Sequence, residues 1–198
     1  SVDTKPATIS FIVPTDKHWY NTDQTLSWTI TDNGSGMDYF KWEWNDDTPD
    51  TRKDSSSGST KLSVPGQGKH TLYVQAWDKV GNHTSVKSRG WFGYDTAPPN
   101  MPTISPGCNA SDNQWQNTCR DPNFSWRATD PNGDDGSGVD QYAYAWNTSS
   151  SDNPSTWGDA TSHDPSAITN ADGVARYYLH VKAKDVAGNT SSVNTFGL

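Results

Sequence analysis

The stretch Asp78-Lys79-Val80-Gly81-Asn82-His83-Thr84 recurs later in the chain as Asp185-Val186-Ala187-Gly188-Asn189-Thr190-Ser191. Upstream of it, Leu26-Ser27-Trp28 likewise recurs as Phe124-Ser125-Trp126. Motifs that recur in the same order are the signature of a duplicated structural unit. The sequence therefore predicts two copies of one domain rather than a single large fold.

The chain is long enough for two small domains, because it has 198 residues and single domains commonly hold roughly 100 to 150. We place the first domain at residues 1–95 and the second at 96–198. The linker Tyr94-Asp95-Thr96-Ala97-Pro98-Pro99 joins them, and the related segment Val2-Asp3-Thr4-Lys5-Pro6 opens the chain. Prolines fix φ and stiffen a linker. We therefore expect two domains strung end to end with limited bending, excised from a larger protein at a domain boundary.

Alternating side chains predict the strands of each copy. The aromatic pattern Phe40-x-Trp42-x-Trp44 has its counterpart in Tyr142-x-Tyr144-x-Trp146, and Leu72-x-Val74-x-Ala76 in Leu179-x-Val181-x-Ala183. A period of two is typical of a strand with one buried face. Short strands separated by turn-rich clusters build sandwiches. We predict an all-β fold of two tandem antiparallel β-sandwich domains.

Composition limits both the core and the partners. Only 31% of the residues are apolar, but 12% are aromatic and ten are Trp, so we expect cores rich in aromatic rings, each burying roughly 200 Å². The formal net charge is −8, and Lys and Arg are scattered along the chain without the basic stripe that a nucleic-acid partner requires. No segment is apolar over the ~18 residues needed to span a bilayer. We expect neither nucleic-acid binding nor membrane insertion.

The two cysteines, Cys108 and Cys119, lie close together in sequence near the start of the second copy. A metal site needs more ligands than two cysteines at this spacing supply. We therefore expect a local disulfide, with two free thiols as the alternative. Because disulfides persist in oxidising compartments, this expectation indicates an extracellular protein, either secreted or at the cell surface.

Several motifs together resemble a known family. They are the Asp-Thr-x-Pro-Pro linker, Leu26-Ser27-Trp28, Gly34-Ser35-Gly36-Met37 before an aromatic strand, and the closing Tyr73-x-x-Ala76-x-Asp78-x-x-Gly81-Asn82. The chain resembles bacterial extracellular immunoglobulin-like repeats of fibronectin type III character. Such repeats serve as spacers in adhesins, cell-surface proteins and secreted depolymerases. The resemblance implies a non-catalytic tandem module for spacing, presentation, adhesion or protein interaction; the alternative is a carbohydrate-binding accessory module of a secreted polysaccharide-degrading enzyme.

Catalytic motifs give no reason to expect an enzyme. The sequence contains no Gly-x-Ser-x-Gly elbow, no His-Glu-x-x-His helix and no phosphate-cradling loop, which carry hydrolytic and phosphoryl-transfer chemistry. Glu43 is the only glutamate, so a glutamate pair for glycoside hydrolysis is excluded, although two aspartates could serve in principle. The resemblance supplies no catalytic residue to carry over.

An acidic loop in the second copy is the candidate metal site. It contains Asp130, Asn132, Asp134, Asp135 and Asp140, with glycines between them that permit a tight wrap. Closely spaced oxygen ligands are what Ca²⁺ requires. The match is partial, and the favoured alternative is a solvated turn held by its own Asx hydrogen bonds. We expect no other cofactor.

Aromatic side chains are the second candidate for ligand binding. Tyr73 and Trp77 belong to the strand face opposite Leu72, and Trp157 lies in or near a loop of the second copy. Flat rings exposed to solvent can stack on the apolar faces of sugars, but a Trp in a small sandwich more often packs in the core or under a loop. The partners expected are neighbouring domains of the parent protein and a protein or polysaccharide ligand.

Overall fold

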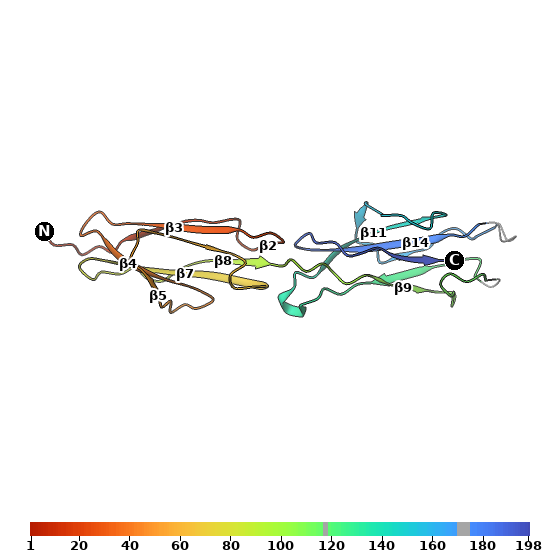
Figure 1. Ribbon diagram of the computed structural model, residues 1–198, viewed down its shortest axis with the longest axis horizontal. Coiled ribbons are helices and arrows are strands. Elements are labelled where there is room, and N and C mark those ends of the chain that lie inside the picture. Colours follow the sequence, from red (N-terminus) through yellow and green to blue (C-terminus); the bar gives the residue numbers. More distant parts are fainter. Residues whose placement is uncertain (117–118, 170–174) are drawn as a thin grey trace. The chain divides into compact units, whose positions relative to one another are not determined.

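The computed structural model describes residues 1–116, 119–169 and 175–198. The chain divides into two compact units, Ser1–Thr96 and Ala97–Leu198 (Figure 1), which we call unit 1 and unit 2. The boundary predicted from the sequence lies between residues 95 and 96. Every regular element of the described residues is a β-strand, apart from a single short 3₁₀ helix, η1 (Gly133–Asp135). The all-β fold class is confirmed.

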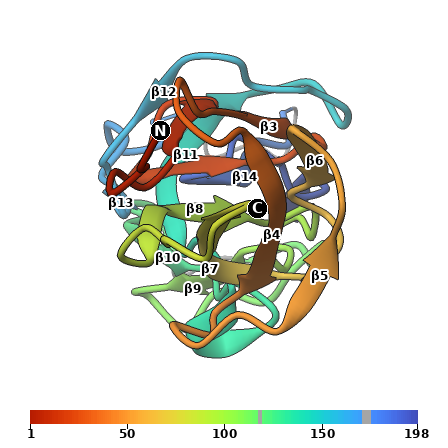
Figure 2. The same cartoon turned by 90° about the vertical axis from the view of Figure 1, so that its left-hand side faces the viewer.

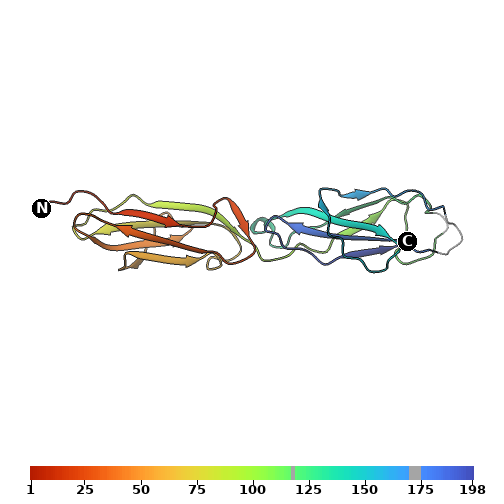
Figure 3. The ribbon, with the colours of Figure 1, turned by 90° about the horizontal axis from the view of Figure 1, so that it is seen from above.

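Unit 1 has two sheets, which Figures 2 and 3 show from two directions. The first has the order β1 (Thr8–Ile12), β3 (Thr25–Thr31) and β6 (Ser57–Lys61). The second has the order β2 (His18–Tyr20), β8 (Lys87–Tyr94), β7 (Gly68–Asp78), β4 (Met37–Trp44) and β5 (Thr51–Lys53). Neighbouring strands are antiparallel except β2 and β8, which pair in parallel.

The core of unit 1 follows from the alternation in its strands. Along β7, residues from Gly68 to Asp78 are buried at every second position, so Leu72, Val74 and Ala76 face the other sheet. Trp28 on β3 meets Phe40 on β4 edge to face, with ring centroids 5.5 Å apart. These contacts join the two sheets into one hydrophobic core.

Unit 2 repeats this plan with shorter edge strands. One sheet has the order β13 (Ser162–His163), β10 (Phe124–Arg127) and β9 (Thr103–Pro106). The other has the order β12 (Trp157–Gly158), β11 (Val139–Asn147), β14 (Tyr178–Asp185) and β15 (Asn194–Gly197). The buried core consists of Phe124, Trp126, Leu179, Val181 and Phe196. The tyrosines and tryptophan predicted to alternate along β11 pack against that core.

The two units differ most clearly at their final strands. In unit 1, Trp19 on β2 is buried beside Gly93, where a Cβ atom would come within 2.4 Å of the indole. Trp115, the sequence counterpart of Trp19, is 67% exposed. Gly197, the counterpart of Gly93, instead accepts a hydrogen bond from the backbone N–H of Asn113 (2.9 Å). A shared glycine therefore accommodates a ring in unit 1 and a polar loop in unit 2.

The loop that replaces β2 in unit 2 carries the predicted disulfide. Cys108 and Cys119 are bonded, and their Cα atoms lie 5.7 Å apart, within the usual range for a disulfide. No free cysteine is left in the chain. The expectation of a local disulfide is confirmed.

Candidate functional site

The turn that repeats in the two units is built around a buried aspartate. In unit 1, Asp78 Oδ1 accepts hydrogen bonds from the backbone N–H groups of Val80 (3.0 Å) and Asn82 (2.8 Å), and Oδ2 accepts one from Asn82 Nδ2 (2.7 Å). Gly81 has φ 93°, in the left-handed region that glycine adopts without strain. The Asp-x-x-Gly-Asn motif thus fixes the turn through one carboxylate.

Two further carboxylates converge on Asp78. Asp32 Oδ2 accepts a hydrogen bond from the backbone N–H of Gly36 (2.6 Å), and Asp3 Oδ2 accepts one from that of Ser35 (2.6 Å). Oxygen atoms of Asp3, Asp32 and Asp78 all lie within 4.8 Å of one another. We call these three residues the Asp3 cluster. Backbone N–H groups thus orient all three side chains toward one point.

The electrostatics of the Asp3 cluster favour a positive ligand. Carboxylates this close together repel one another when all are ionised. No Lys or Arg among the described residues forms an ion pair with the three carboxylates. Hydrogen bonds from the backbone N–H of Ser35, and then that of Lys5, hold the pKa of Asp3 below its ordinary value of 3.8, which keeps Asp3 ionised. Carboxylate oxygens are ligands for a hard cation such as Ca²⁺.

Unit 2 repeats part of this arrangement. Asp185 Oδ1 accepts a hydrogen bond from the backbone N–H of Asn189 (2.8 Å), as Asp78 does from Asn82 in unit 1. Asp130 Oδ2 accepts a hydrogen bond from the backbone N–H of Gly138 (2.5 Å). Oxygen atoms of Asp130 and Asp185 lie within 4.8 Å of each other. Asp130 and Asp185 are the sequence counterparts of Asp32 and Asp78.

The acidic loop predicted as a calcium site is spread over several elements. Asn132 has φ 74° and precedes η1, while Asp134 and Asp135 lie exposed in η1 and Asp140 lies exposed on β11. Asp130 alone of the predicted set belongs to an acidic cluster found among the described residues. The metal site predicted from the sequence did not include Asp3, Asp32 or Asp185, and the turn-capping role was favoured for Asp185. Their signal was present in the recurrence of each aspartate at matching positions of the two copies.

Tyr73 and Trp77 lie on the outer face of β7, where Trp77 is part of a row of stacked side chains. Tyr39, opposite it on β4, stacks on the indole with ring centroids 4.8 Å apart and an interplanar angle of 11°. His83 lies opposite Trp77 on its other side, with centroids 5.7 Å apart. Arg52 covers Tyr39 at 3.7 Å. Trp77 therefore presents the edge of its ring to solvent rather than the uncovered face that stacking on a sugar needs.

Trp157 lies against two lysines of β14, a strand of the same sheet. On β12 it pairs with Ala143 of β11, and the ammonium groups of Lys182 and Lys184 lie 5.1 and 4.9 Å from the centroid of its ring. Cation–π contacts of this kind hold a ring in place. The structure thus gives Trp157 an internal role, and its role in ligand binding stays a prediction, as do those of Tyr73 and Trp77.

A groove that the sequence did not predict lies at the edge of unit 2. It has a volume of about 770 Å³, and its lining includes Tyr144, Trp146, His163, Asp164 and Tyr177. The stacked rings of Trp146 and Tyr177 have centroids 5.5 Å apart, and those of Tyr144 and His163 lie 5.1 Å apart. The alternation along β11 assigned Tyr144 and Trp146 to the core, which they do contact. The alternation did not predict that Tyr144 and Trp146 also line this groove.

Three known structures are similar to this chain in the course of the backbone, each at low sequence identity. The fibronectin(III)-like modules of Clostridium thermocellum CbhA match at 12% identity and a TM-score of 0.39, covering 96% of this chain and 92% of that one. The three N-terminal domains of the bacteriophage RB49 Highly Immunogenic Outer Capsid protein match at 11% and 0.47, covering 96% and 68%. The D00-D0 domain of intimin matches at 11% and 0.38, covering 96% and 99%.

The first of these neighbours consists of fibronectin(III)-like modules, the kind of repeat that the sequence resembles. The assignment of the fold itself rests on strand order and register. No protein-family model matches the sequence, and no curated protein matches it.

No helix in the described part of the chain is long and apolar enough to cross a membrane.

Proposed function

We propose that this chain is a non-catalytic tandem immunoglobulin-like module of a larger secreted or cell-surface bacterial protein, where it spaces and presents a neighbouring domain. Each unit has its own hydrophobic core, as a repeated structural element requires. The side chains that recur between the units, above all Asp78 and Asp185, bind the backbone of their own turns.

The observation that carries this proposal is the path of the chain through each unit. In unit 1 the chain enters beside the turn after β7, where Asn82 Nδ2 donates a hydrogen bond to the carbonyl of Asp3 (3.2 Å). It leaves along β8, whose last residue, Tyr94, pairs with Gly68 at the start of β7. The chain therefore enters and leaves at opposite ends of the same long strand.

Unit 2 follows the same path. Near the start of unit 2, the backbone N–H of Asn100 donates to the carbonyl of Thr129 (2.8 Å), next to Asp130 at the Asp185 end of β14. At the other end of β14, the backbone N–H of Leu198 donates to the carbonyl of Tyr177 (2.8 Å). A domain crossed from end to end adds its own length to a chain. Since β7 has 11 residues at about 3.4 Å each, unit 1 adds roughly 35 Å.

The test places the chain between a cell-surface anchor and a reporter domain. Capture of the reporter by coated beads should rise when the chain separates the two, because the reporter then stands clear of the surface. The matched comparison is the same fusion with unit 1 only, which should give an intermediate capture. Equal capture with and without the chain would refute the presentation role.

The acidic clusters favour a second candidate function, the binding of calcium. The Asp3 cluster joins the first residues of unit 1 to two of its turns, so we propose that Ca²⁺ bound there fixes the chain where it enters the unit. Binding to the folded state alone would raise the melting temperature in proportion to the logarithm of the calcium concentration.

The calcium proposal can be tested by calorimetric titration of the whole chain and by melting in the presence of a chelator. The variant with Asp3→Asn and Asp32→Asn keeps acceptors for the backbone N–H groups but removes two charges, so it should lose calcium binding. Asp54→Asn is the matched control, since Asp54 is exposed and pairs with Arg52. Unchanged melting with calcium and with chelator would refute this role.

A further inference from the structure

The groove of unit 2 exists because the edge strands of its two sheets are short. On one sheet, β12 pairs only with Tyr142 and Ala143, so β11 continues past it through Trp146. On the other sheet, β13 pairs only with Phe124 and Ser125. The inward side chains at the end of β11 therefore reach a space that no strand of the described residues covers.

The equivalent edge of unit 1 is closed by a hydrogen bond between the sheets. There Trp44 Nε1 on β4 donates to Thr60 Oγ1 on β6 (3.3 Å). Trp146 is the counterpart of Trp44. His163 is the counterpart of Thr60, because Thr60 pairs with Leu26 and His163 with Phe124, the matching residue of unit 2. The smaller space at this edge of unit 1 has a volume of about 360 Å³.

The substitution of histidine for threonine leaves polar groups in the groove without partners. The rings of Trp146 and His163 have centroids 6.5 Å apart, and among the described residues Trp146 Nε1 makes no hydrogen bond. The same holds in this part of the structure for the hydroxyls of Tyr144 and Tyr177 and for the Asp164 carboxylate. Donors and an acceptor thus line the groove beside partly exposed rings.

We propose that this groove binds a neutral oligosaccharide. Its volume and its mixture of rings with a few polar groups fit a small-molecule site. The rings of Trp146 and Tyr177 stack on each other and so offer a sugar their apolar edges, while the indole N–H, the hydroxyls and the carboxylate match sugar hydroxyls. No Lys or Arg is among the described residues that line it, so an anionic sugar, a phosphate or a nucleic acid would lack a counter-charge.

A peptide is the competing occupant, and the strand edge disfavours it. A peptide that adds to a sheet needs a continuous open edge for its backbone hydrogen bonds. Here β12 already occupies the edge of β11 at Tyr142 and Ala143, which interrupts such an edge. The groups without partners in the groove belong to side chains, which can bond to ligand hydroxyls without a free strand edge. This inference goes beyond the presentation role and does not rest on it.

The experiment is a nuclear magnetic resonance titration of the whole chain with four neutral probes: cellohexaose, xylohexaose, mannohexaose and chitohexaose. At least one should shift the indole N–H signal of Trp146 and the imidazole signals of His163. Release of reducing ends is measured on the same samples, and none is expected. If no probe shifts these signals, the proposal is wrong.

Variants separate a groove site from binding elsewhere. His163→Thr recreates the arrangement of unit 1, in which the threonine can accept the indole hydrogen bond, so affinity should fall by about tenfold or more while the fold is kept. Asp164→Asn should weaken binding through the loss of a charged acceptor. Trp115→Ala is the control, because it removes an exposed tryptophan of the same unit outside the groove. Equal affinity of His163→Thr, Asp164→Asn and the parent chain would overturn the proposal.

A proline-rich peptide is titrated in parallel, since such peptides dock in aromatic grooves. If it shifts the Trp146 signal and no sugar does, the groove is a peptide site and the proposal is wrong. If reporter capture is equal with and without the chain but a sugar binds here, the presentation role alone is refuted.

Discussion

The sandwich edge between β4 and β6 is closed in unit 1, whereas the equivalent edge between β11 and β13 is open in unit 2. Both units bury matching strands around a tryptophan, Trp28 in one and Trp126 in the other. The difference arises at Thr60 and His163, which occupy the same position opposite β3 and β10. Two copies with the same core can therefore differ at their edges. There, one polar side chain determines whether a hydrogen bond joins the two sheets.

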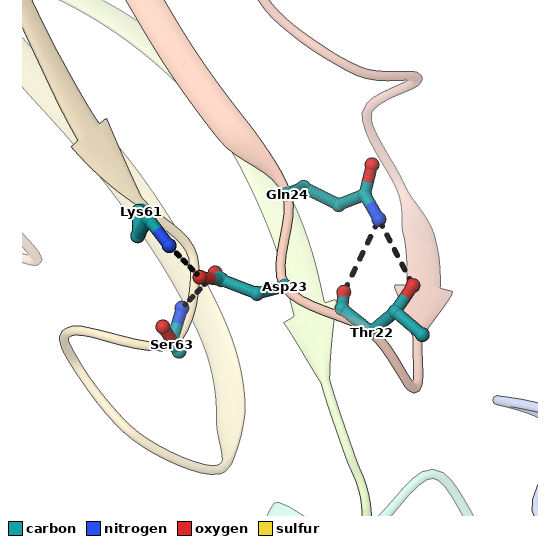
Figure 4. Close-up of polar contacts among 5 residues, drawn as sticks. All are labelled: Thr22, Asp23, Gln24, Lys61 and Ser63. Carbon is teal, nitrogen blue, oxygen red and sulfur yellow. Dashed lines mark hydrogen bonds and ion pairs between the residues drawn. The ribbon is translucent and has the colours of Figure 1, made fainter.

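At the end of β6, a side chain of unit 1 joins two neighbouring strands of one sheet (Figure 4). Asp23 Oδ1 accepts a hydrogen bond from the backbone N–H of Ser63 (3.0 Å), and Asp23 Oδ2 pairs with Lys61 Nζ (3.1 Å). This aspartate lies two residues before β3 in the chain and so joins β6 to β3. Its sequence counterpart in unit 2, Asp121, makes no hydrogen bond among the described residues. Within the part that the structure describes, unit 2 thus lacks both the hydrogen bond between the sheets and this contact within one sheet.

The largest expected effect tests whether the cores are in fact equivalent. Trp28→Ala and Trp126→Ala each remove a tryptophan that is at most 4% exposed, so each should destabilise its own unit by about 3–5 kcal/mol. Differential scanning calorimetry should show one transition lowered and the other unchanged. A much smaller loss for Trp126→Ala would mean that the cores differ as well as the edges.

Removal of the disulfide should affect unit 2 alone. Replacing Cys108 and Cys119, which are 11 residues apart, by serine frees a short loop in the unfolded chain. This should cost about 3 kcal/mol in the loop-entropy description. Denaturant unfolding of each unit, followed through its own tryptophans, measures the loss. A shift in the unit 1 transition would show that the units do not unfold independently.

The hydrogen bond between Trp44 and Thr60 should contribute less to the free energy of unfolding than the disulfide does. Thr60→Val keeps the shape of the side chain but leaves Trp44 Nε1 without its acceptor, so unit 1 should lose about 1 kcal/mol. In unit 2, His163→Val removes no hydrogen bond to the described residues and should cost less. Comparable losses in urea unfolding would show that the Thr60 bond does not distinguish the two edges.

The smallest effect should come from acid. Hydrogen bonds from the backbone N–H of Ser63 and from Lys61 lower the pKa of Asp23 below its ordinary 3.8. The folded chain therefore binds this proton less readily than the unfolded chain, and the stabilisation is lost as the pH falls below 3.8. Asp23→Asn should flatten the pH dependence of unit 1 in that range. An unchanged acid profile would mean that the ionised Asp23 side chain contributes nothing to the stability of unit 1.

The strands and turns could be predicted because their signals are local. Alternation along Leu72, Val74 and Ala76 placed the core, and the Asp-x-x-Gly-Asn motif specified its own turn through Asp78 and a glycine with positive φ. Side chain and backbone lie within a few residues of each other in these cases. The cysteines were also close enough in sequence for a disulfide to be expected.

The edges and the candidate sites depend on contacts between distant segments, which the sequence pattern does not contain. Trp19 and Trp115 align in sequence, yet one is buried on β2 and the other exposed. Trp77 has the spacing of an exposed platform, but its faces are covered by Tyr39 and His83, whose positions depend on the register of other segments. His163 gave no signal, because its meaning comes from its place opposite Phe124.

The parallel pairing of β2 with β8 gives unit 1 a particular response to mechanical force. Tension on the two ends of the chain draws β2 and β8 in opposite directions along their length. The hydrogen bonds between His18–Tyr20 and Phe92–Tyr94 are then loaded in shear and must break together, not one after another. In the described part of unit 2 no parallel pair occurs, but Cys108–Cys119 keeps the residues it encloses from extending. A pulled chain would meet a cooperative barrier in unit 1 and a covalent limit in unit 2.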